Sequence, residues 1–327
     1  MVHQTRRPYV LSLKRRLMTM SHFSPVVPDT LANHTICVTG HGGYVGRHVV
    51  STLISAGHTP FLIGRIDTVQ TPVAGAAMAA PWSDAHALSR QLMTLDAPVV
   101  LNIAGHFVSR HSATDIPALV SGNLEYPLTI FEAAADAGDT PIVNVGTSWE
   151  FSDKGTPTPA NLYAQLKAAN AQTLEYYART RALRGVNLKL NDTFGGKDTR
   201  GKVMGAMRDA WLAGRSMQLR SWAQPINLLH ITDVVEGLFA AAQRATQLPL
   251  QTVDTAFLMH DETVTLGAIS ELLADIVPEF AIDFDDRRHE DSSLRGVWAD
   301  GPRLMQWEPR VTLEAGLRSY FTRGDPR

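Results

Sequence analysis

The chain has 327 residues, of which 44% are hydrophobic and 19% charged, the balance of a globular protein that can bury a sizeable core. Its 30 Lys and Arg residues against 32 Asp and Glu residues give a formal charge of -2, which argues against a dedicated nucleic-acid binder. Cys37 is the only cysteine, which excludes an internal disulfide and a cysteine-based zinc cluster, and no apolar run approaches the ~20 residues that a membrane span needs.

Residues 1–34 differ from the rest of the chain, because they carry five basic side chains against one acidic side chain, Asp29. Three interpretations are open: a targeting leader, a secretory signal, or a disordered tail that could reflect a start site assigned too early, with Met18 or Met20 as the true first residue. The apolar stretch at 9–13 is too short for a secretory signal, so we favour the disordered tail. We place no function here and expect a cytoplasmic protein, because the cysteine content suits a reducing compartment.

From residue 35 onward, short β-rich runs alternate with helical stretches, which predicts a parallel sheet covered by helices. The expected elements, in chain order, are a strand at 35–39, a helix ending near 56, a strand at 60–63, a weakly signalled strand and loop within 66–80, a strand at 98–103, a helix at 115–137, a strand at 141–145, a helix at 163–183 and a strand at 186–190. Beyond these we expect helices near 201–213, 232–245, 265–276 and 313–322, separated by short strands or loops.

This order predicts an α/β fold with a Rossmann-type doubly wound parallel sheet and a smaller mixed C-terminal lobe. We expect residues 35–190 to form an NAD(P)-binding domain that also receives later segments near 226–260. Residues 191–327 are then mainly a substrate-binding lobe.

A glycine-rich turn, Thr39-Gly-His-Gly-Gly-Tyr-Val-Gly46, follows the first strand and opens the first helix. This context is what a dinucleotide-binding turn requires. Glycines would allow the tight turn, the approach of a pyrophosphate to the helix N-terminus, and close packing of helix on strand. The predicted cofactor contacts in this turn are Gly40, Gly42, Gly43, Tyr44, Val45 and Gly46.

The end of the second strand bears on which nicotinamide cofactor is used. An NAD site usually has an acidic residue there for the ribose 2′-hydroxyl, whereas this chain has Arg65. A guanidinium can pair with a 2′-phosphate, so Arg65 favours NADP(H). NAD(H) remains possible, because Asp67 could serve the ribose.

Tyr163 and Lys167 stand four residues apart at the start of a predicted helix, which puts phenol and ammonium on one face. A nearby ammonium stabilises the phenolate and so lowers the pKa of the phenol, which lets the side chain act as an acid or a base near neutral pH. Thr147 ends a strand sixteen residues earlier, and its hydroxyl could donate to the same substrate oxygen.

Together these motifs resemble the extended short-chain dehydrogenase/reductases, the NAD-dependent epimerase/dehydratase family of nucleotide-sugar enzymes. The resemblance covers about residues 35–322. It implies that Tyr163 is the general acid/base, that Lys167 tunes it and binds the nicotinamide ribose, and that Thr147 binds the reacting oxygen. It adds cofactor contacts at Ile103, Ala104, Gly105 and Asn123. Later matching segments are 192–196, 229–233, 307–309 and 313–316.

Departures from the family pattern reduce the number of reactions that this chain is expected to catalyse. Family dehydratases follow the catalytic threonine with Asp-Glu, where this chain has Ser148 and Trp149, and Glu150 should face elsewhere if the segment is extended. A 4,6-dehydratase is therefore disfavoured. Residues 146–150 and 192–202 look most like 4-ketoreductases of CDP- or dTDP-linked deoxysugars, and Arg65 agrees with NADPH.

Substrate contacts are harder to place. The family's diphosphate-binding arginine is replaced by Ile226, so a cation among Arg200, Lys202, Arg215 and Arg220 would have to substitute. His106 and His111 follow a strand end and could line the sugar pocket. The predicted substrate contacts are Ser148, Trp149, His106, Asp192, Lys202 and Arg220.

Three other functions stay open. One is an NAD-dependent nucleotide-sugar epimerase, and another is a reductase of a non-nucleotide carbonyl compound with Phe107, Trp149 and Trp222 in an apolar pocket. The third, a non-enzymatic cofactor sensor, is disfavoured because the whole catalytic set is present. We expect no bound metal, no membrane or nucleic-acid partner, and a homodimer formed through 115–137 and 163–183, as in the family.

Overall fold

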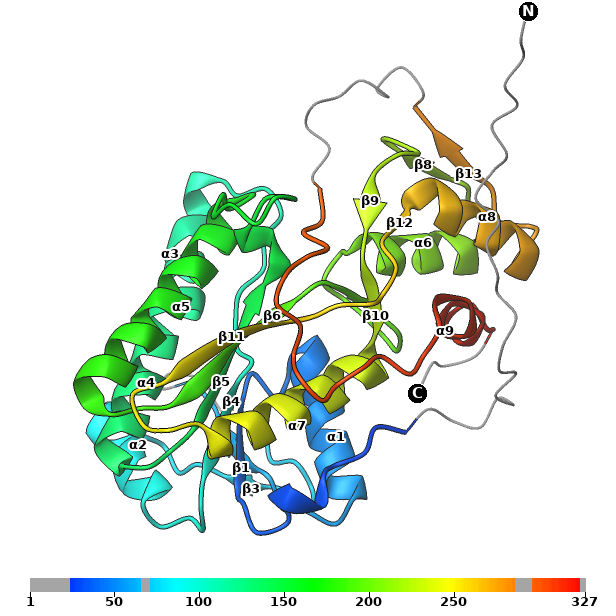
Figure 1. Cartoon of the computed structure of the whole chain (residues 1–327). Coiled ribbons are helices and arrows are strands. Elements are labelled where there is room, and N and C mark those ends of the chain that lie inside the picture. Colours follow the sequence, from blue (N-terminus) through cyan, green and yellow to red (C-terminus); the bar gives the residue numbers. More distant parts are fainter. Residues whose placement is uncertain (1–23, 66–70, 286–295, 324–327) are drawn as a thin grey trace, which may run out of the picture.

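The computed structural model describes residues 24–65, 71–285 and 296–323. Its centre is a seven-stranded parallel sheet in the order β11-β6-β5-β4-β1-β2-β3, which confirms the predicted fold class (Figure 1). From β1 the chain runs outward through β2 and β3, then returns beside β1 and runs the other way from β4. Ligands of such sheets bind where this reversal opens a crevice beyond the carboxyl ends of the strands. The strands are β1 (Ile36–Thr39), β2 (Phe61–Ile63), β3 (Ala77–Met78), β4 (Val99–Asn102), β5 (Ile142–Thr147), β6 (Gly185–Leu190) and β11 (Val253–Leu258).

Helices cover both faces of the sheet (Figure 1). α1 (Tyr44–Ser55) and α7 (Ile231–Gln247) lie on one face. The other face carries α2 (Ala85–Leu92), α4 (Tyr126–Ala137) and α5 (Leu162–Arg181). A short helix, α3 (Ile116–Val120), runs through a π-helical turn into α4.

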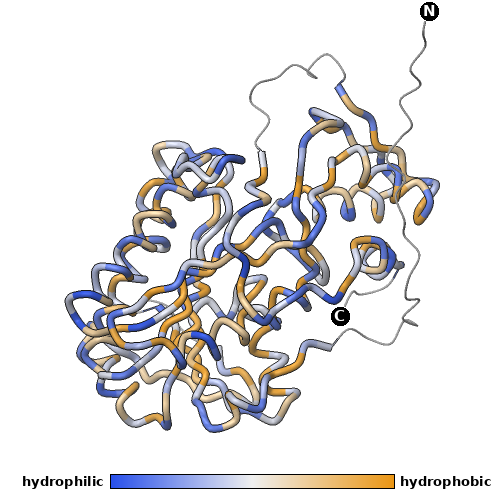
Figure 2. Tube along the Cα trace, in the orientation of Figure 1, coloured by the Kyte–Doolittle hydropathy of each residue, from blue (hydrophilic) through white to orange (hydrophobic). Residues whose placement is uncertain are grey.

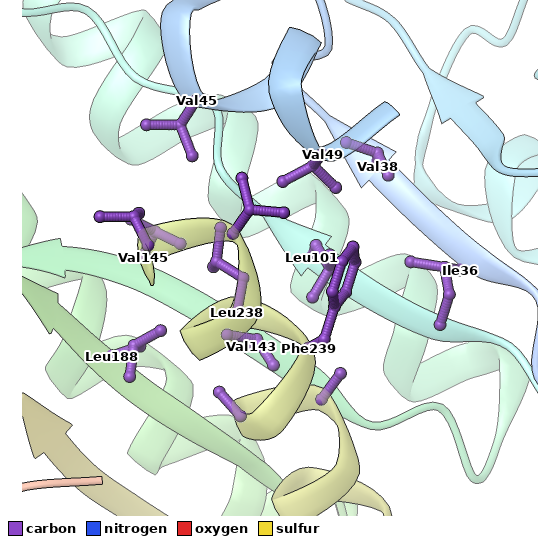
Figure 3. Close-up of a cluster of buried hydrophobic side chains, with 14 of the residues drawn as sticks. Ile36, Val38, Val45, Val49, Leu101, Val143, Val145, Leu188, Leu238 and Phe239 are labelled. Carbon is purple, nitrogen blue, oxygen red and sulfur yellow. The ribbon is translucent and has the colours of Figure 1, made fainter. Parts of the chain in front are cut away.

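The sheet is buried because its strands are almost continuously apolar and both of their faces are covered. Every residue of β1, β4 and β5 is buried. Leu238 and Phe239 of α7 point onto Leu101 and Val143 of the sheet (Figure 3). Burying one such side chain contributes about 1.5–3 kcal/mol. Hydrophobic segments accordingly gather along the strands (Figure 2).

A ladder of polar side chains crosses four strands inside this apolar layer. Thr39, Asn102, Asn144 and Asn187 are partners in the strand register. Each side-chain amide donates to the next oxygen: Asn102 Nδ2 to Asn144 Oδ1 at 3.0 Å, and Asn144 Nδ2 to Asn187 Oδ1 at 2.9 Å. Thr39 Oγ1 donates to Asn102 Oδ1 at 3.0 Å. The ladder therefore satisfies its buried polar atoms and favours a single strand register.

A smaller lobe is built from later segments and has its own apolar cluster, including Phe194, Trp211 and Tyr320 (Figure 1). It pairs β10 with β7, β12 with β9 and β13 with β8. Its elements are β7 (Asp192–Phe194), α6 (Val203–Leu212), β8 (Met217–Leu219), β9 (Pro225–Ile226), β10 (Leu228–His230), β12 (Val264–Thr265), α8 (Leu266–Ile276), β13 (Ile282–Phe284) and α9 (Leu313–Tyr320).

Two parts of the chain differ from expectation. α2 was not predicted; the Asp84 side chain caps it by accepting from the Ala87 amide at 2.8 Å. The packed part of the chain also begins before residue 35, because Leu31 lies in a short 3-10 turn and is fully buried in the core. Residues 1–23, which make up most of the predicted extension, and 66–70, which belong to the weakly signalled segment, lie outside the described residues.

Across the described ranges, no helix is long and apolar enough to cross a membrane.

Candidate active site

The glycine-rich turn lies at the crevice between β1 and β4. Gly40 adopts a φ of +67°, in the left-handed region that favours glycine. A Cβ on Gly46 would come within 2.1 Å of the Gly40 carbonyl oxygen, so this close contact of helix and turn requires glycine. Gly43 precedes α1, and no side chain caps the first amides of that helix. Uncapped amides at a helix N-terminus are donors suited to a phosphate.

One cavity of about 550 Å³ joins this turn to the predicted catalytic residues and to the smaller lobe. Its size lies within the range of small-molecule sites, ~300–1,000 Å³. Of the predicted site residues it brings together Gly40, Gly42, Gly43, Tyr44, Val45, Gly46, Arg65, Ile103, Ala104, Gly105, His106, Thr147, Tyr163, Lys167, Asp192 and Lys202.

Arg65 is exposed at the rim of the cavity, directly after β2. Its Nη2 donates to Ser121 Oγ at 3.3 Å, so the guanidinium is oriented across the end of the strand. The cation is thus at the position predicted to discriminate between the two nicotinamide cofactors. Asp67, the alternative ribose partner, lies outside the described residues.

Tyr163 and Lys167 both face the cavity from the first turns of α5, as their spacing predicts. Asn161 begins this helix by accepting from the Ala164 amide at 2.9 Å. Lys167 Nζ donates to two carbonyl oxygens, those of Ala104 and Val145, each at 3.0 Å. The ammonium is therefore fixed between the ends of β4 and β5.

Burial is the largest influence on the pKa values of Tyr163 and Lys167, the two side chains predicted to be catalytic. It raises the pKa of the Tyr163 phenol well above its ordinary value; the Glu150 carboxylate raises it further and the Arg200 guanidinium lowers it. Burial lowers the pKa of the Lys167 ammonium to about 8. The tuning role of Lys167 stays a prediction. At neutral pH the phenol is protonated and can donate a proton.

Thr147 ends β5 and begins a 3-10 turn over Ser148–Glu150. Its Oγ1 accepts from the Trp149 amide at 3.2 Å, which leaves the hydroxyl hydrogen available toward the cavity. The Glu150 side chain turns back and accepts from the Thr147 amide at 2.8 Å. Glu150 does face away from the cavity, as expected, but because of this turn and not because the segment is extended.

One wall of the cavity combines aromatic rings of the sheet domain with cations of the smaller lobe. Lys202 Nζ lies 4.1 Å from the ring centroids of both Phe107 and Trp149, and 3.4 Å from Asp192 Oδ1. The Phe107 ring in turn packs edge-on against the Tyr163 ring, with centroids 5.2 Å apart. The wall therefore reaches Tyr163.

Arg200 forms a second part of this wall. Its guanidinium lies 4.0 Å above the Tyr44 ring and is held by Asp198 and Thr193 at 2.8 Å. Tyr44 also donates to the Gly195 carbonyl oxygen at 2.5 Å. These contacts connect the glycine-rich turn to the smaller lobe.

Several predicted residues lie outside the cavity lining. Asn123 is buried and positions the loop after β4: its Nδ2 donates to the His106 carbonyl oxygen at 2.8 Å and its Oδ1 accepts from the His106 amide at 3.2 Å. Ser148 is buried and Trp149 is half-buried, and neither lines the cavity, while Arg220 is exposed away from it. The weighed candidates Arg215, His111 and Trp222 do not contribute to the lining either.

Sequence reasoning missed Lys189, which forms a buried ion pair with Glu150 directly behind Thr147. A lysine inside a strand was the available signal, since lysine is almost never fully buried unless paired. It also missed Tyr126, which lines the cavity and donates to the Ile63 carbonyl oxygen at 3.1 Å.

Among the residues that the structure describes, no group of three or more His, Cys, Asp or Glu side chains is arranged to hold a metal ion.

Comparison with known proteins agrees with this geometry. A sequence model of the NAD dependent epimerase/dehydratase family matches residues 36–253. The chain belongs to this family. It is an NAD(P)-dependent enzyme of the extended short-chain dehydrogenase/reductase type, as its motifs indicated.

Two family members of known activity are moderately similar to this chain in sequence. The chain is 28% identical over 204 residues to the CDP-abequose synthase of Yersinia pseudotuberculosis, covering 62% of this chain and 71% of that protein. It is 23% identical over 324 residues to the UDP-glucose 4-epimerase of Rhizobium leguminosarum bv. trifolii, covering 89% and 97% of the two chains.

Solved family structures share the fold. The Thermotoga maritima UDP-glucose 4-epimerase with UDP-glucose superposes with a TM-score of 0.71 at 18% identity, covering 88% of this chain and 97% of that one. MoeE5 in complex with UDP-glucuronic acid and NAD gives 0.69 at 17% identity, covering 86% and 96%.

The residues present fit a nicotinamide dinucleotide. The Gly40 turn and the Ala104 backbone approach so closely that a Cβ on Gly40 would lie 2.7 Å from the Ala104 Cα. The uncapped amides of α1 suit the pyrophosphate, and the same cavity also contains Tyr163 and Lys167.

Proposed function

We propose that this family member reduces a 4-keto nucleotide deoxysugar, linked to CDP or dTDP, with NADPH. The observation that carries the proposal is one cavity whose lining includes Thr147, Tyr163 and Lys167 together with Arg65 and two cations of the smaller lobe, Arg200 and Lys202. The 28% identity to a CDP-abequose synthase supports the same substrate class.

The chain's own residues would promote reduction by polarising the substrate carbonyl. The Thr147 hydroxyl and the Tyr163 phenol donate to the carbonyl oxygen, and the phenol then gives up its proton to the developing alkoxide. Lys167 holds positive charge close by. NADPH, when bound, supplies the hydride. Fixed donors of this kind matter because losing one typically costs ~10²–10³-fold in rate.

Tyr163 is suited to the acid role in reduction. Its phenol is protonated at neutral pH, and burial raises its pKa further, so it can donate a proton to the developing alkoxide. An epimerase would use the same side chain as a base in its oxidative half, so the protonation state by itself agrees with both reactions.

Removal of water from the sugar has no support at this site. Ser148 and Trp149 carry no carboxylate, and the Glu150 carboxylate is engaged by Lys189 and the Thr147 amide, outside the cavity lining.

Two cations in the cavity wall favour a nucleotide sugar over a neutral ketone. Arg200 and Lys202 both line the cavity and can reach an anionic substrate group, and a diphosphate needs such donors. Each cation already has a carboxylate neighbour, Asp198 for Arg200 and Asp192 for Lys202, and its remaining N–H groups can donate to a diphosphate, which a purely apolar substrate would not use.

An NAD-dependent epimerase is the second candidate. The observation in its favour is that the sequence similarity to a UDP-glucose 4-epimerase extends over 89% of this chain. The two functions differ in how they hold the cofactor, because an epimerase keeps the same molecule through its cycle.

The test is the nucleotide content of freshly purified protein. The protein is denatured and any released nicotinamide nucleotide is identified, and stripped protein is titrated with NADPH and NADH. An exchangeable site that prefers NADPH supports the reductase. Stoichiometric, tightly held NAD⁺ contradicts the role of Arg65 and favours the epimerase.

The cytoplasmic location, the homodimer and the substrate-binding role of residues 191–327 stay predictions.

A further inference from the structure

A fully buried ion pair lies behind the catalytic end of β5. The Lys189 Nζ and Glu150 Oε2 atoms are 2.5 Å apart, and the two side chains are only 3% and 2% exposed. Neither side chain lines the cavity, so neither is placed to touch a substrate or cofactor. Charges are seldom buried this deeply unless the pair has other partners, because desolvation is costly.

The second partner of this pair is the catalytic threonine itself. Glu150 Oε1 accepts from the Thr147 amide at 2.8 Å, while the Thr147 hydroxyl oxygen accepts from the Trp149 amide. The Thr147 side chain also accepts from the Glu150 backbone amide, and this bond and the bond from the Thr147 amide to the Glu150 side chain together form a capping box around the 3-10 turn. One oxygen of Glu150 therefore holds the Thr147 amide, while the amides of the same turn hold the Thr147 hydroxyl oxygen.

The strand register provides the room for this arrangement. Lys189 of β6 lies directly opposite Gly146 of β5. A Cβ on Gly146 would come within 2.5 Å of Glu150 Oε1 and 2.8 Å of Lys189 Cδ. Glycine at 146 thus allows the lysine to cross over the strand to the carboxylate, and the lysine holds that carboxylate in the orientation that meets the Thr147 amide.

We propose that Glu150, held in place by Lys189, is a positioning residue that sets the Thr147 hydroxyl for the reacting carbonyl oxygen. This inference rests on the proposed function, because it assigns the pair a role in the reductive step. A merely structural ion pair would affect folding but not the turnover of folded enzyme.

The experiment compares two uncharged replacements of the pair. E150Q/K189M keeps a side-chain oxygen that can accept from the Thr147 amide, and E150L/K189M removes it. Changing both partners together avoids leaving one buried charge unpaired, which is the change that most strongly destabilises. E150M/K189M, with a flexible side chain of similar length, removes the same acceptor and serves if the leucine variant does not fold.

The control is D139N/R184M, which removes a more exposed ion pair. Asp139 and Arg184 form an ion pair of 2.7 Å that bridges the segments leading into β5 and β6, at their amino ends, far from the cavity. This variant should leave both kcat and KM unchanged.

We expect E150L/K189M to lose about tenfold or more in kcat, because misplacing a catalytic group by ~1 Å can cost ~100-fold. Its KM for NADPH should stay within about twofold of the wild type, since the pair does not line the cofactor site, and E150Q/K189M should recover most of the lost kcat. Wild-type kcat in folded E150L/K189M would overturn the proposal, as would an equal loss in both variants.

Failure of the proposed function would be seen separately. Wild-type protein that reduces none of the 4-keto nucleotide sugars refutes that function whatever the variants do. Amide hydrogen exchange then tests the positioning bond without substrate: the Thr147 amide should exchange faster in E150L/K189M than in E150Q/K189M. Equal exchange rates in the two variants would overturn the inference.

Discussion

Tyr163 is the residue on which the proposed chemistry depends most. Its phenol lies in the cavity beside Thr147 and Lys167, and burial keeps it protonated. We expect Tyr163→Phe to lower kcat by roughly 10²–10⁴-fold, the usual contribution of a positioned acid, while the Kd for NADPH changes little. Steady-state kinetics and fluorescence titration measure the two quantities. Retained turnover would remove Tyr163 from the mechanism.

Arg65 is the residue that should choose the cofactor. It lies exposed at the cavity rim after β2 and is oriented by Ser121. Arg65→Ala should weaken NADPH binding by about tenfold, the value of one charge-assisted hydrogen bond, and leave NADH binding unchanged. Calorimetric titration with both cofactors is the check, and Arg90→Ala, an exposed arginine on α2, is the control. An equal loss for NADPH and NADH would contradict the role assigned to the guanidinium.

At the level of elements, the asparagine ladder is what holds four strands in register. Asn144 occupies its middle, receiving from Asn102 and donating to Asn187. Asn144→Leu would leave a donor and an acceptor buried without partners, at ~1–3 kcal/mol each, so we expect the free energy of unfolding to fall by about 2–5 kcal/mol. Chemical denaturation measures it.

Asn170 provides the matched control for the ladder. This α5 residue is equally buried, but its side-chain nitrogen and oxygen both have no hydrogen-bond partner. Asn170→Leu should therefore be neutral or stabilising, since it removes a polar group that gains nothing from the fold. A similar loss of stability in both variants would show that the ladder hydrogen bonds are not the cause.

The sequence predicted the elements that have local signals. The turn after residue 39, the Tyr163/Lys167 spacing and the strand ending at Thr147 depend on neighbours a few residues apart, and each lies in the cavity as expected. The helix at 85–92 was missed although it carries local signals, because Asp84 caps its start and Leu88 and Leu92, four residues apart, form its buried face.

Features that depend on strand register could not be predicted from the sequence. The Glu150–Lys189 pair joins residues 39 apart, and it exists only because β5 and β6 align Gly146 with Lys189. The lining by Arg200 and Lys202, and not by Arg220, likewise depends on how the smaller lobe folds over the sheet.

At the scale of the whole molecule, two histidines mark the contact between the sheet domain and the smaller lobe. His48 of α1 and His230 at the start of α7 pack around the Gly195–Gly196 turn. Burial lowers the pKa of each imidazole to about 4, helped at His48 by the Arg47 guanidinium. Both rings are therefore neutral in the folded protein at pH values where an exposed histidine binds a proton.

These values predict how stability depends on pH. As pH falls from about 6.5 toward 4, the unfolded chain binds protons that the folded chain excludes, so stability falls and then levels off. Asp233 opposes this trend, because burial raises its pKa to about 6 and its protonation favours the folded state in the same window.

His48→Gln isolates the histidine contribution. Between pH 7 and pH 5 the melting temperature of the variant should fall less than that of the wild type. The difference between the two falls should be ~2–4 °C for each kcal/mol of pH-dependent stability that the substitution removes. Calorimetry in matched buffers measures how the melting temperature of each protein depends on pH, and Asp233 contributes equally to this dependence in both proteins. Identical slopes would mean that the His48 imidazole is not excluded from protonation by the fold.

The central claim is NADPH-dependent reduction in the cavity between sheet and smaller lobe. The most direct test follows NADPH oxidation at 340 nm with CDP- and dTDP-linked 4-keto-6-deoxysugars, with Tyr163→Phe as the blank. The account predicts that one of them is consumed with equimolar loss of NADPH and formation of an alcohol, and that the blank is inactive. Interconversion of UDP-sugars without net NADPH consumption would contradict it.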